Sequence, residues 1–552
     1  MNTKRIFFTL AGILALTLAD ARVPSELVVD ANGATQFLVN GKPFVMLAGE
    51  IHNSSNSSIG YMNRLWPTLK ELNLNTVLAA ISWEQFEPRE GCFDYTLIDN
   101  LIAGARANDM KVVVLWFGSW KNGESSYAPV WVKRDTKRFL RVRNAQGAEI
   151  ETLSPFCTQT RDADEKAYVA LVRHIRSIDA ETGTVIALQP ENEVGIFQDR
   201  DYSQLSLHSY EEEVPQALID YLRKNHKTLR PELRSVWEEH GAKTAGSWRE
   251  LFGDNPWSRS FHVTWHYASY IDRIAAAGKA IYPLPTFCNC WIVQQENDLP
   301  GVYPNGGPVS RVMDIWKAAA PHVDILAPDI YLPRFKEIVA DYHRADNPLL
   351  IPESVMSPGN AFWAFGEHDA LCYSPFGIED GAGNYLFAET YRVLDELSPL
   401  IVRFRNTPDM IGVMNTGEEK ERVVEMGEFR LSISYDSEDA CGLIIRTGED
   451  EFIVAGIGFK VAFSAIDSRR TGYILQVLEG GFSDGEWKTE RILNGDETYH
   501  HTRLIAKGRK KVSTERINNY AADHSTGVFV YSPESYKALW SPGIYRVTTY
   551  LR

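Results

Sequence analysis

One stretch of the chain, residues 185–195 (VIALQPENEVG), restricts the possible folds more than any other. It begins as an apolar run, which is typical of a strand buried on both faces in a parallel sheet. It ends in Gln189, Glu191, Asn192 and Glu193. A buried parallel strand that ends in carboxylate and amide side chains is typical of an α/β barrel, whose functional groups lie at the carboxyl ends of the strands.

A second stretch, residues 348–354 (PLLIPES), has the same design: an apolar strand followed by one carboxylate, Glu353. Glutamate is common in exposed loops, and two unrelated loop residues are the alternative interpretation. Glu193 and Glu353 instead each close an apolar run, which is an unusual place for a glutamate without a role. We therefore predict that these two carboxylates, remote in the chain, face one substrate.

Strand-like and helix-like segments alternate through most of the chain. Eight apolar strand candidates occupy residues 44–52, 76–83, 111–120, 185–195, 285–291, 324–331, 348–354 and part of 365–378. Segments with helical spacing of apolar residues lie between them, at 59–72, 95–108, 162–178, 309–320, 333–345 and 384–406. Eight strands alternating with helices predict a (β/α)8 TIM barrel. A doubly wound sheet is the competing fold, but its usual glycine-rich phosphate turn after the first strand is missing.

The barrel is expected to fill residues 22–406, beginning with a short antiparallel β segment at 27–39. After residue 407 the pattern changes to short alternating strands separated by glycines and Asp or Asn turns. This change is typical of a β-sandwich. The sequence therefore predicts a C-terminal all-β, sandwich-like domain at 407–552.

The connection after the strand at 185–195 is long and contains helical segments between residues 217 and 277. Such connections often lie over the barrel mouth and shape a substrate cleft, and we expect the same here. His262 and His266 stand at i, i+4 on the last of these helices, which is a possible metal pair. No HExxH pattern accompanies them, and we predict no metal site.

Residues 1–21 have the three parts of a secretory signal. Lys4 and Arg5 supply a charged start, residues 6–18 form an apolar run too short to span a bilayer comfortably, and residues 19–21 fit a cleavage site. A buried N-terminal helix is the alternative. We expect an exported protein, periplasmic, outer-membrane-associated or secreted, without a transmembrane segment. The net charge of −15 disfavours nucleic acid and anionic membranes as partners.

Six cysteines are too few for a disulfide scaffold in a chain of 552 residues. Cys288 and Cys290 lie two apart on a predicted strand, so they share a face and are badly placed to bond each other. We expect most cysteines to be free and buried. Because no zinc-type pattern occurs, neither a metal nor another cofactor is predicted.

Paired carboxylates of this kind suit cleavage of a glycosidic bond. One carboxyl must protonate the departing oxygen, and the other must be ionised close to the sugar carbon. We assign Glu193 as acid/base and Glu353 as nucleophile, with Asn192 as a donor to a sugar 2-hydroxyl. Tyr331 is expected to hydrogen-bond Glu353 and hold it ionised, with a packed aromatic as the alternative. Glu191 is interpreted as a structural residue because Pro190 makes a regular strand doubtful.

Several motifs resemble those of glycoside hydrolase family 35, the β-galactosidases, in the clan of retaining (β/α)8-barrel glycosidases known as clan A. Residues 189–195 are similar to the family pattern Gln-x-Glu-Asn-Glu-Tyr-Gly. Further similar stretches are 49–52 (GEIH), 75–88 with 90–94, and 128–131 (APVW). The resemblance spans residues 35–400 approximately, and it implies Glu193 as acid/base, Glu353 as nucleophile, and sugar contacts from Asn192 and Glu50.

The chain departs from the family at sugar-binding positions. Family members often have Tyr where this chain has Ala80, and a His where it has Phe86. Many also have an acidic residue on the third strand, where residues 115–120 (LWFGSW) offer none. These differences leave the mechanism intact and weaken the assignment of galactose.

Four tryptophans are candidates for an open aromatic subsite that would suit a branched polysaccharide fragment, because aromatic faces stack on sugar rings. They are Trp83, Trp116, Trp120 and Trp291. Packing in the barrel core is the alternative for each of them.

Taken together, these patterns predict a retaining, exo-acting β-galactosidase that needs no cofactor. Its expected partner is a carbohydrate, such as a plant cell-wall oligosaccharide derived from xyloglucan, and an oligomer is possible. One alternative is another retaining β-glycosidase of the same clan, of glucosidase, arabinosidase or mannosidase type. The second alternative, a non-catalytic carbohydrate-binding barrel, is disfavoured because both glutamates are present.

Overall fold

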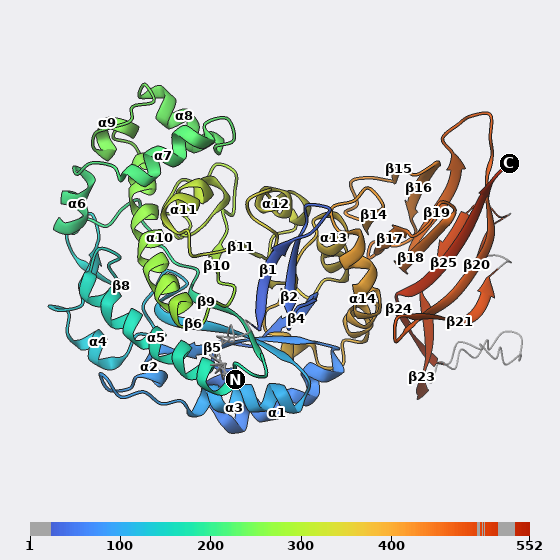
Figure 1. Cartoon of the computed structure of the whole chain (residues 1–552), viewed down its shortest axis with the longest axis horizontal. Coiled ribbons are helices and arrows are strands. Elements are labelled where there is room, and N and C mark those ends of the chain that lie inside the picture. Colours follow the sequence, from blue (N-terminus) through green and yellow to red (C-terminus); the bar gives the residue numbers. More distant parts are fainter. Residues whose placement is uncertain (1–23, 494–496, 500, 502, 517–535) are drawn as a thin grey trace, which may run out of the picture.

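The computed structural model describes residues 24–493, 497–499, 501, 503–516 and 536–552. Residues 1–21, predicted to be a secretory signal, lie outside the described residues. A large helical body and a smaller body of strands lie side by side, as Figure 1 shows. Within the described ranges, no helix is both long and apolar enough to span a membrane.

The larger body is built around eight parallel strands in the order β10-β11-β12-β13-β4-β5-β6-β9. A parallel bridge between Leu188 and Thr286 joins β9 to the residue just before β10, so the sheet closes into a barrel. The strands are β4 (Met46–Glu50), β5 (Thr76–Ser82), β6 (Lys111–Lys121), β9 (Val185–Asn192), β10 (Phe287–Trp291), β11 (Ile325–Ile330), β12 (Ile351–Ser354) and β13 (Cys372–Pro375). The predicted (β/α)8 barrel is thereby confirmed.

Helices surround the barrel because each strand–helix connection returns the chain along the outside of the sheet. They are α1 (Ile59–Glu71), α3 (Thr96–Ala107), α5 (Thr158–Asp179), α10 (Pro256–Ile281), α11 (Met313–Ala319), α12 (Phe335–Tyr342), α13 (Pro358–Glu367) and α14 (Tyr385–Phe404). The helix α13 was not predicted as a helix, and its last three residues overlap the segment 365–378 that was considered for the eighth strand.

Two apolar clusters stabilise the barrel, one on each side of the strands. Alternate residues of the strands fill the interior, where Ala48, Val113 and Ile186 belong to one buried apolar cluster. The opposite faces pack against the surrounding helices. An N-terminal hairpin closes the amino-terminal end of the barrel and contributes Phe37 to the interior cluster. It consists of β1 (Ser25–Val29) and β2 (Thr35–Val39), with β3 (Lys42–Pro43) beside them.

The helices inserted after β9 were expected over the barrel mouth, and the contacts of α7, α8 and α9 are with helices of the outer ring. The contacts place α7 against α11, and both α8 and α9 against α10, so they extend the outer ring at one edge (Figure 1). The apolar side of α7, with Leu218, Ile219 and Leu222, is buried there. This insertion comprises α6 (Gln204–Tyr210), α7 (Gln216–Asn225), α8 (Pro231–Glu239) and α9 (Trp248–Phe252).

The connection after β6 also carries short elements. These are α4 (Val130–Arg134), β7 (Arg141–Arg143) and β8 (Glu149–Leu153), and α2 (Trp83–Phe86) follows β5. They lie at the same end of the barrel as the carboxyl ends of the strands, where a site is expected.

The smaller body is a sandwich of two antiparallel sheets that share one apolar cluster. Alternation explains the packing, since Phe429, Leu431 and Ile433 of one strand point inward and their neighbours outward. One sheet contains β14 (Met410–Met414), β17 (Cys441–Arg446), β18 (Glu451–Ile457), β25 (Gly543–Leu551), β20 (Gly472–Ser483) and β21 (Glu486–Leu493); the other contains β15 (Glu421–Met426), β16 (Phe429–Tyr435), β19 (Phe459–Ala465) and β22 (Arg503–Ala506). The pair β23 (Arg509–Arg516) and β24 (Tyr536–Ser541) is separate.

The two bodies meet where α13 packs on β14 and β17. A side chain at Gly366 would collide with the backbone of Gly412, which shows how closely helix and strand approach. Arg422 forms an ion pair with Glu367 across the same junction, at 2.8 Å.

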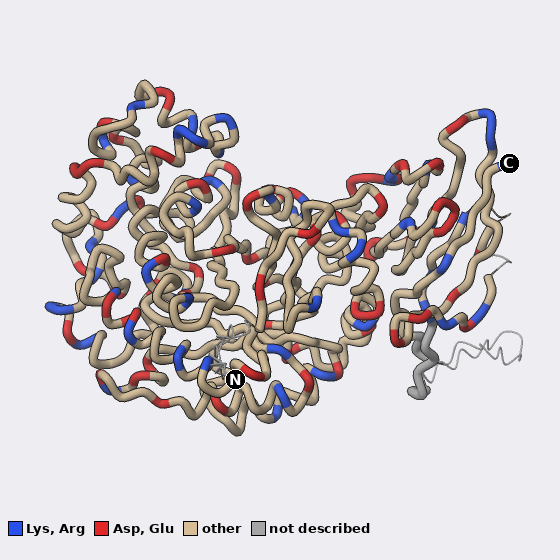
Figure 2. Tube along the Cα trace, viewed as in Figure 1, with Lys and Arg blue, Asp and Glu red and all other residues tan. Residues whose placement is uncertain are grey.

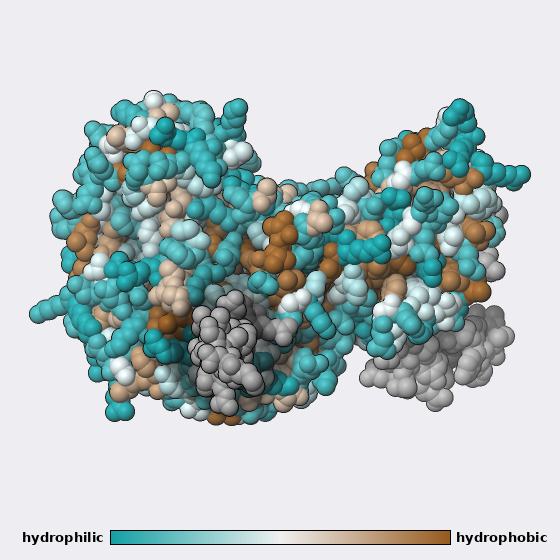
Figure 3. All heavy atoms as spheres, in the orientation of Figure 1, coloured by the Kyte–Doolittle hydropathy of each residue, from teal (hydrophilic) through white to brown (hydrophobic). Residues whose placement is uncertain are grey.

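The surface is polar and carries both signs of charge. Lys and Arg are interspersed with Asp and Glu along the described part of the chain in Figure 2. The face in Figure 3 is mainly hydrophilic, with apolar residues in small separate groups.

Candidate active site

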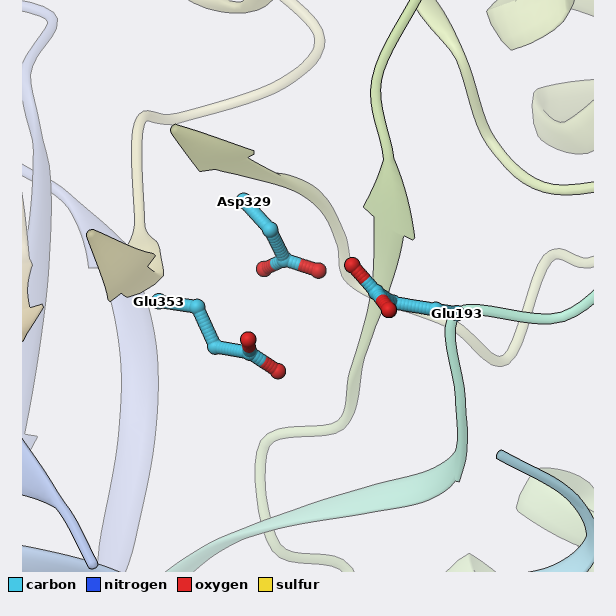
Figure 4. Close-up of side chains that lie close together, drawn as sticks. All are labelled: Glu193, Asp329 and Glu353. Atoms are coloured by element: carbon cyan, nitrogen blue, oxygen red, sulfur yellow. The ribbon is translucent and has the colours of Figure 1, made fainter. Parts of the chain in front are cut away.

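The barrel brings Glu193, just after β9, and Glu353, on β12, to the same end of the sheet. Figure 4 shows these carboxylates and that of Asp329 pointing toward one another. One oxygen from each of the three lies within 4.8 Å of the other two. Glu193 and Glu353 are 6% and 4% exposed, so both carboxylates are largely shielded from bulk water.

The backbone at the end of β9 turns Glu193 into the barrel. Glu191 and Glu193 both have positive φ, 64° and 43°, which is unusual for residues other than glycine and typical of functional sites. The N–H of Glu193 donates to Asn289 Oδ1 at 3.0 Å, and its carbonyl accepts from the N–H of Gly123 at 3.0 Å. The loop after β6 and the strand β10 therefore fix the direction of this side chain.

Glu191 points away from Glu193 and into the protein. Its carboxylate accepts hydrogen bonds from the N–H groups of Ser119 and Trp120, at 3.0 and 2.7 Å. Burial, and then the neighbouring charge of Asp164, raise the pKa of Glu191 well above its ordinary value. Glu191 therefore stabilises the carboxyl end of β6 and lies away from Glu193 and Glu353.

Asn289 connects the groups of the site, although the sequence analysis did not select it. Its amide Nδ2 donates to Asn192 Oδ1 at 3.1 Å, to Asp329 Oδ2 at 2.9 Å and to Glu353 Oε1 at 3.3 Å. The signal available in the sequence was an asparagine within the apolar strand 285–291.

Asn192 lies beside the two catalytic candidates. Its Oδ1 accepts from Gln189 Nε2 at 2.9 Å as well as from Asn289, so the orientation of its amide is set by two donors. Its Nδ2 makes only a long contact of 3.4 Å to Asn122. This arrangement leaves the Nδ2 group as the part of Asn192 suited to donate to a sugar hydroxyl.

Asp329 is a third carboxylate that sequence analysis missed. It is 2% exposed and pairs in register with Glu353 of the neighbouring strand. Burial, followed by the charges of Glu353 and Glu193, raises the pKa of Asp329 well above its ordinary value. An aspartate inside the apolar run 324–331 was the signal that could have identified it.

One buried cation balances these acids. The Nζ of Lys121, at the end of β6, lies 3.8 Å from Glu353 Oε1, and the residue is 6% exposed. Burial by itself lowers the pKa of Lys121, but the charges of Glu353, Glu50 and Glu193 outweigh it and raise the pKa. Lys121 therefore remains an ammonium group and stabilises negative charge in the pocket.

Glu50 lies on β4 and is 1% exposed. Neither of its carboxylate oxygens has a hydrogen-bond partner within the described protein. Burial and then the charge of Glu353 raise the pKa of Glu50 well above its ordinary value. A buried polar group without a protein partner fits the predicted contact with a substrate hydroxyl.

Two further observations divide the roles of the two glutamates. Burial, then the charge of Glu353, raises the pKa of Glu193 to about 7, and Lys121 offsets part of this rise. Glu353 accepts a hydrogen bond from the Tyr331 hydroxyl at 2.9 Å, in addition to the contacts from Asn289 and Lys121. Glu193 is thus suited to hold a proton near neutral pH, while three positive or donor groups stabilise the carboxylate of Glu353.

Three of the four tryptophans predicted for an open subsite are in the core. Trp83, Trp116 and Trp120 are completely buried. Their indole N–H groups donate to Glu87, to Asp164 and to the carbonyl of Leu153, respectively. The subsite interpretation is wrong for these three because their strands and connecting segments turn them outward, toward the helices; only Trp291, 37% exposed, reaches the surface.

The histidine pair and the cysteines have structural surroundings. His262 and His266 are packed against Phe156, and burial lowers the pKa of both imidazoles. All six cysteines are free, and five are buried. Among the described residues, only Glu193, Asp329 and Glu353 bring three potential ligand atoms together; these are the three carboxylates of the candidate site, and we assign no metal to them.

Comparisons with known proteins match two segments of the chain. Residues 36–239 match the family described as Glycosyl hydrolases family 35, and residues 387–505 match a domain of unknown function, DUF5597. A β-galactosidase of Xanthomonas manihotis is 29% identical over 34% of this chain and 30% of its own length. The human β-galactosidase-1-like protein 3 is 28% identical over 35% of this chain and 29% of its own length.

Solved structures show a coarse likeness. A β-galactosidase from Bacillus circulans sp. alkalophilus has a TM-score of 0.45 and 14% identity, covering 65% of this chain and 57% of its own. One from Halorubrum lacusprofundi has a TM-score of 0.44 and 16% identity, covering 64% and 58%. The fold assignment rests on the strand order and not on these scores.

The chain spans less than a third of the length of the curated relatives that it matches. The matched segment contains Glu193 and its motif, and the family model agrees with the motifs recognised in the sequence. The match to Glycosyl hydrolases family 35 thus covers residues 36–239, the half of the barrel that carries the acid/base candidate.

Proposed function

We propose that this protein is a retaining, exo-acting β-galactosidase. The observation that carries the proposal is the pair Glu193 and Glu353, which face each other with oxygens within 4.8 Å and with different electrostatic surroundings. Retaining glycosidases hold their two carboxyl groups about 5–5.5 Å apart, whereas inverting enzymes leave about 6.5–9.5 Å for a water molecule. The close approach supports the retaining mechanism.

In the first step, Glu193 donates its proton to the glycosidic oxygen as the bond from this oxygen to the sugar carbon breaks. The carboxylate of Glu353 attacks the same carbon and forms an ester, and the rest of the substrate departs as an alcohol. The pKa of about 7 keeps Glu193 protonated up to neutral pH. Asn192 and Glu50 are placed to contact sugar hydroxyls during this step.

In the second step, Glu193, now ionised, removes a proton from water while the water oxygen attacks the sugar carbon. The ester bond to Glu353 breaks, and its electron pair returns to the carboxylate. Tyr331 and Lys121 stabilise that returning charge, through the hydroxyl at 2.9 Å and the ammonium at 3.8 Å. Two inversions at one carbon give net retention.

Galactose is proposed from the family and from the curated relatives that are named β-galactosidases. The proposed natural substrate is a plant cell-wall oligosaccharide with terminal β-galactose, such as a xyloglucan fragment. Export by a signal at residues 1–21 is part of the same proposal, since cell-wall fragments are met outside the cytoplasm.

Azide provides a direct test of the two roles. Glu193→Ala should cleave 2,4-dinitrophenyl β-galactoside to a covalent ester that azide releases as the β-galactosyl azide. Glu353→Ala should instead let azide attack the substrate directly and give the α-galactosyl azide. Proton NMR distinguishes the products; the reverse stereochemistry, or wild-type hydrolysis by either variant, would refute the assignment.

A different sugar preference within the same mechanism is the second candidate. This candidate is supported by Ser119, which lies in the region where many family members have an acidic residue. The Ser119 side chain is buried and donates a hydrogen bond to Asp164, away from Glu193 and Glu353. Aryl β-galactoside, β-glucoside, β-mannoside and α-arabinoside should be compared by kcat/KM. A preference of tenfold or more for any sugar over galactose would favour this candidate.

A further inference from the structure

Two exposed aromatic side chains stand at the carboxyl end of the barrel, close to Glu193. Phe197 is 48% exposed and Trp291 is 37% exposed. Their ring centroids are 5.7 Å apart and their planes meet at 84°, so they form a corner with two nearly perpendicular walls. Phe197 and Trp291 therefore remain partly exposed to water and are not packed in the apolar core.

The position of Trp291 follows from the alternation of β10. Phe287 belongs to the cluster inside the barrel, while Cys288 and Cys290 face the helices. Asn289 points inward and contacts Glu353. Since side chains two residues apart share a face, Trp291 lies above Asn289 on the inward face, about 6–7 Å nearer the mouth.

The position of Phe197 is fixed by the same loop that holds Glu193. A side chain added at Gly123 would lie 3.1 Å from the Phe197 ring and 3.2 Å from the carbonyl oxygen of Gly195. The N–H of Gly123 donates to the carbonyl of Glu193. Phe197 is therefore seated on the segment that orients the acid/base candidate.

This side of the pocket is where the leaving group must lie. An acid that protonates the glycosidic oxygen contacts the departing part of the substrate, whereas the nucleophile attacks the opposite face of the sugar. Glu193 N–H contacts Asn289, two residues before Trp291, and Phe197 follows Glu193 by four residues. Both rings thus lie on the two segments that hold Glu193, and we assign them to the leaving-group side.

We propose that Phe197 and Trp291 form a subsite for the first sugar ring of the leaving group, which makes an oligosaccharide the substrate class. The C–H-rich face of a pyranose stacks on one ring while its edge contacts the other, since a perpendicular pair offers both surfaces. This inference rests on the proposed function, because it requires Glu193 as acid/base.

A pair of substrates with and without a ring in the leaving group tests the subsite. β-Galactosyl fluoride has a single-atom leaving group, and β-galactosyl-glucose disaccharides with (1→2), (1→3), (1→4) and (1→6) linkages place a pyranose there. Phe197→Ala and Trp291→Ala should each lower kcat/KM about tenfold on the best disaccharide, a typical loss for one aromatic contact. Both variants should change kcat/KM on the fluoride less than twofold.

Tyr61→Ala is the matched control, because Tyr61 is an aromatic residue on α1 that is 44% exposed. It should leave kcat/KM unchanged on both substrates, and thermal unfolding of all three variants checks their folding. The subsite would be overturned if the Phe197 and Trp291 variants lost kcat/KM equally on fluoride and disaccharide, or lost it on neither substrate. A wild-type enzyme that cleaves the fluoride but none of the disaccharides would also overturn it. A wild-type protein that cleaves neither substrate would instead contradict the proposed function.

Discussion

Replacing Glu193 with glutamine removes the transferable proton and keeps the size of the side chain. General acid catalysis contributes about 10²–10⁴-fold to rates, so kcat/KM for a disaccharide should fall by that factor. A 2,4-dinitrophenyl leaving group needs little protonation, and formation of the ester from it should slow less than tenfold. A burst of dinitrophenol followed by slow turnover, seen by stopped-flow absorbance, is the expected result.

The pH profile of the same variant gives a second measurement. The pKa of Glu193 is raised to about 7, so wild-type kcat/KM should fall as pH rises through this value and the acid loses its proton. Glu193→Gln has no such proton, and this alkaline limb should disappear. A limb that persists unchanged in the variant would assign it to another group and refute the reasoning.

The raised pKa also predicts a change in stability whose sign can be worked out. Between the ordinary value of 4.5 and about 7, the folded protein keeps a proton that the unfolded chain has released. Stability is therefore lost as pH rises through this window, by about 3 kcal/mol at 1.36 kcal/mol per pKa unit. Glu193 is 6% exposed, so little of this figure is removed by solvent screening.

Glutamine cannot ionise, so Glu193→Gln should escape that loss. Relative to wild type, the variant should gain about 3 kcal/mol in free energy of unfolding between pH 4 and pH 8.5. Taking the difference between the two pH values cancels any constant effect of the amide. Urea unfolding at both pH values measures it, and a difference near zero would show that the pocket does not disfavour the ionised acid.

Three other substitutions test neighbouring groups. Lys121→Met removes a cation 3.8 Å from Glu353, a contact of about 4 kcal/mol at an effective dielectric constant of 20. Because Lys121 also lowers the pKa of Glu193, the alkaline limb of kcat/KM should move to higher pH in this variant. Lys121→Arg keeps the positive charge and should move the limb less. Tyr331→Phe removes the 2.9 Å hydrogen bond to Glu353, and kcat should fall about 10–100-fold with wild-type unfolding; an unchanged kcat would make Tyr331 a packing residue only. Trp116→Phe loses the buried bond to Asp164 and should destabilise the protein by about 1.5–3 kcal/mol while KM stays constant, whereas a raised KM would restore the subsite interpretation.

The sequence was sufficient to predict the barrel and to select the two glutamates that the barrel brings together. Strands buried on both faces appear as uninterrupted apolar runs, and their alternation with helices leaves few possible topologies. Glu193 and Glu353 were identified because each stands where such a run ends, and polar groups at that end of a barrel strand have a common destination. The length of the chain between them had no bearing on this inference.

Other members of the site depended on contacts that no local pattern contains. Asp329 and Asn289 are single polar residues inside apolar strands. The sequence does not distinguish such a residue that faces a substrate from one that is hydrogen-bonded in the core. Lys121 acquires its role only because β6 and β12 direct their side chains into one pocket. Glu191 and Glu193 differ in direction because the backbone between them leaves the regular strand.

The tryptophans show the same division. The composition shows that aromatic residues are abundant. Whether each aromatic side chain lies in the core or in a cleft depends on which side of its strand or loop it occupies. Trp116 and Trp120 are buried, while Trp291 is partly exposed at the mouth. Sequence periodicity determined the barrel because burial acts on every residue of a strand. Tertiary structure decided the site, because charges and hydrogen bonds act only across a few ångströms and here join segments that are distant in the sequence.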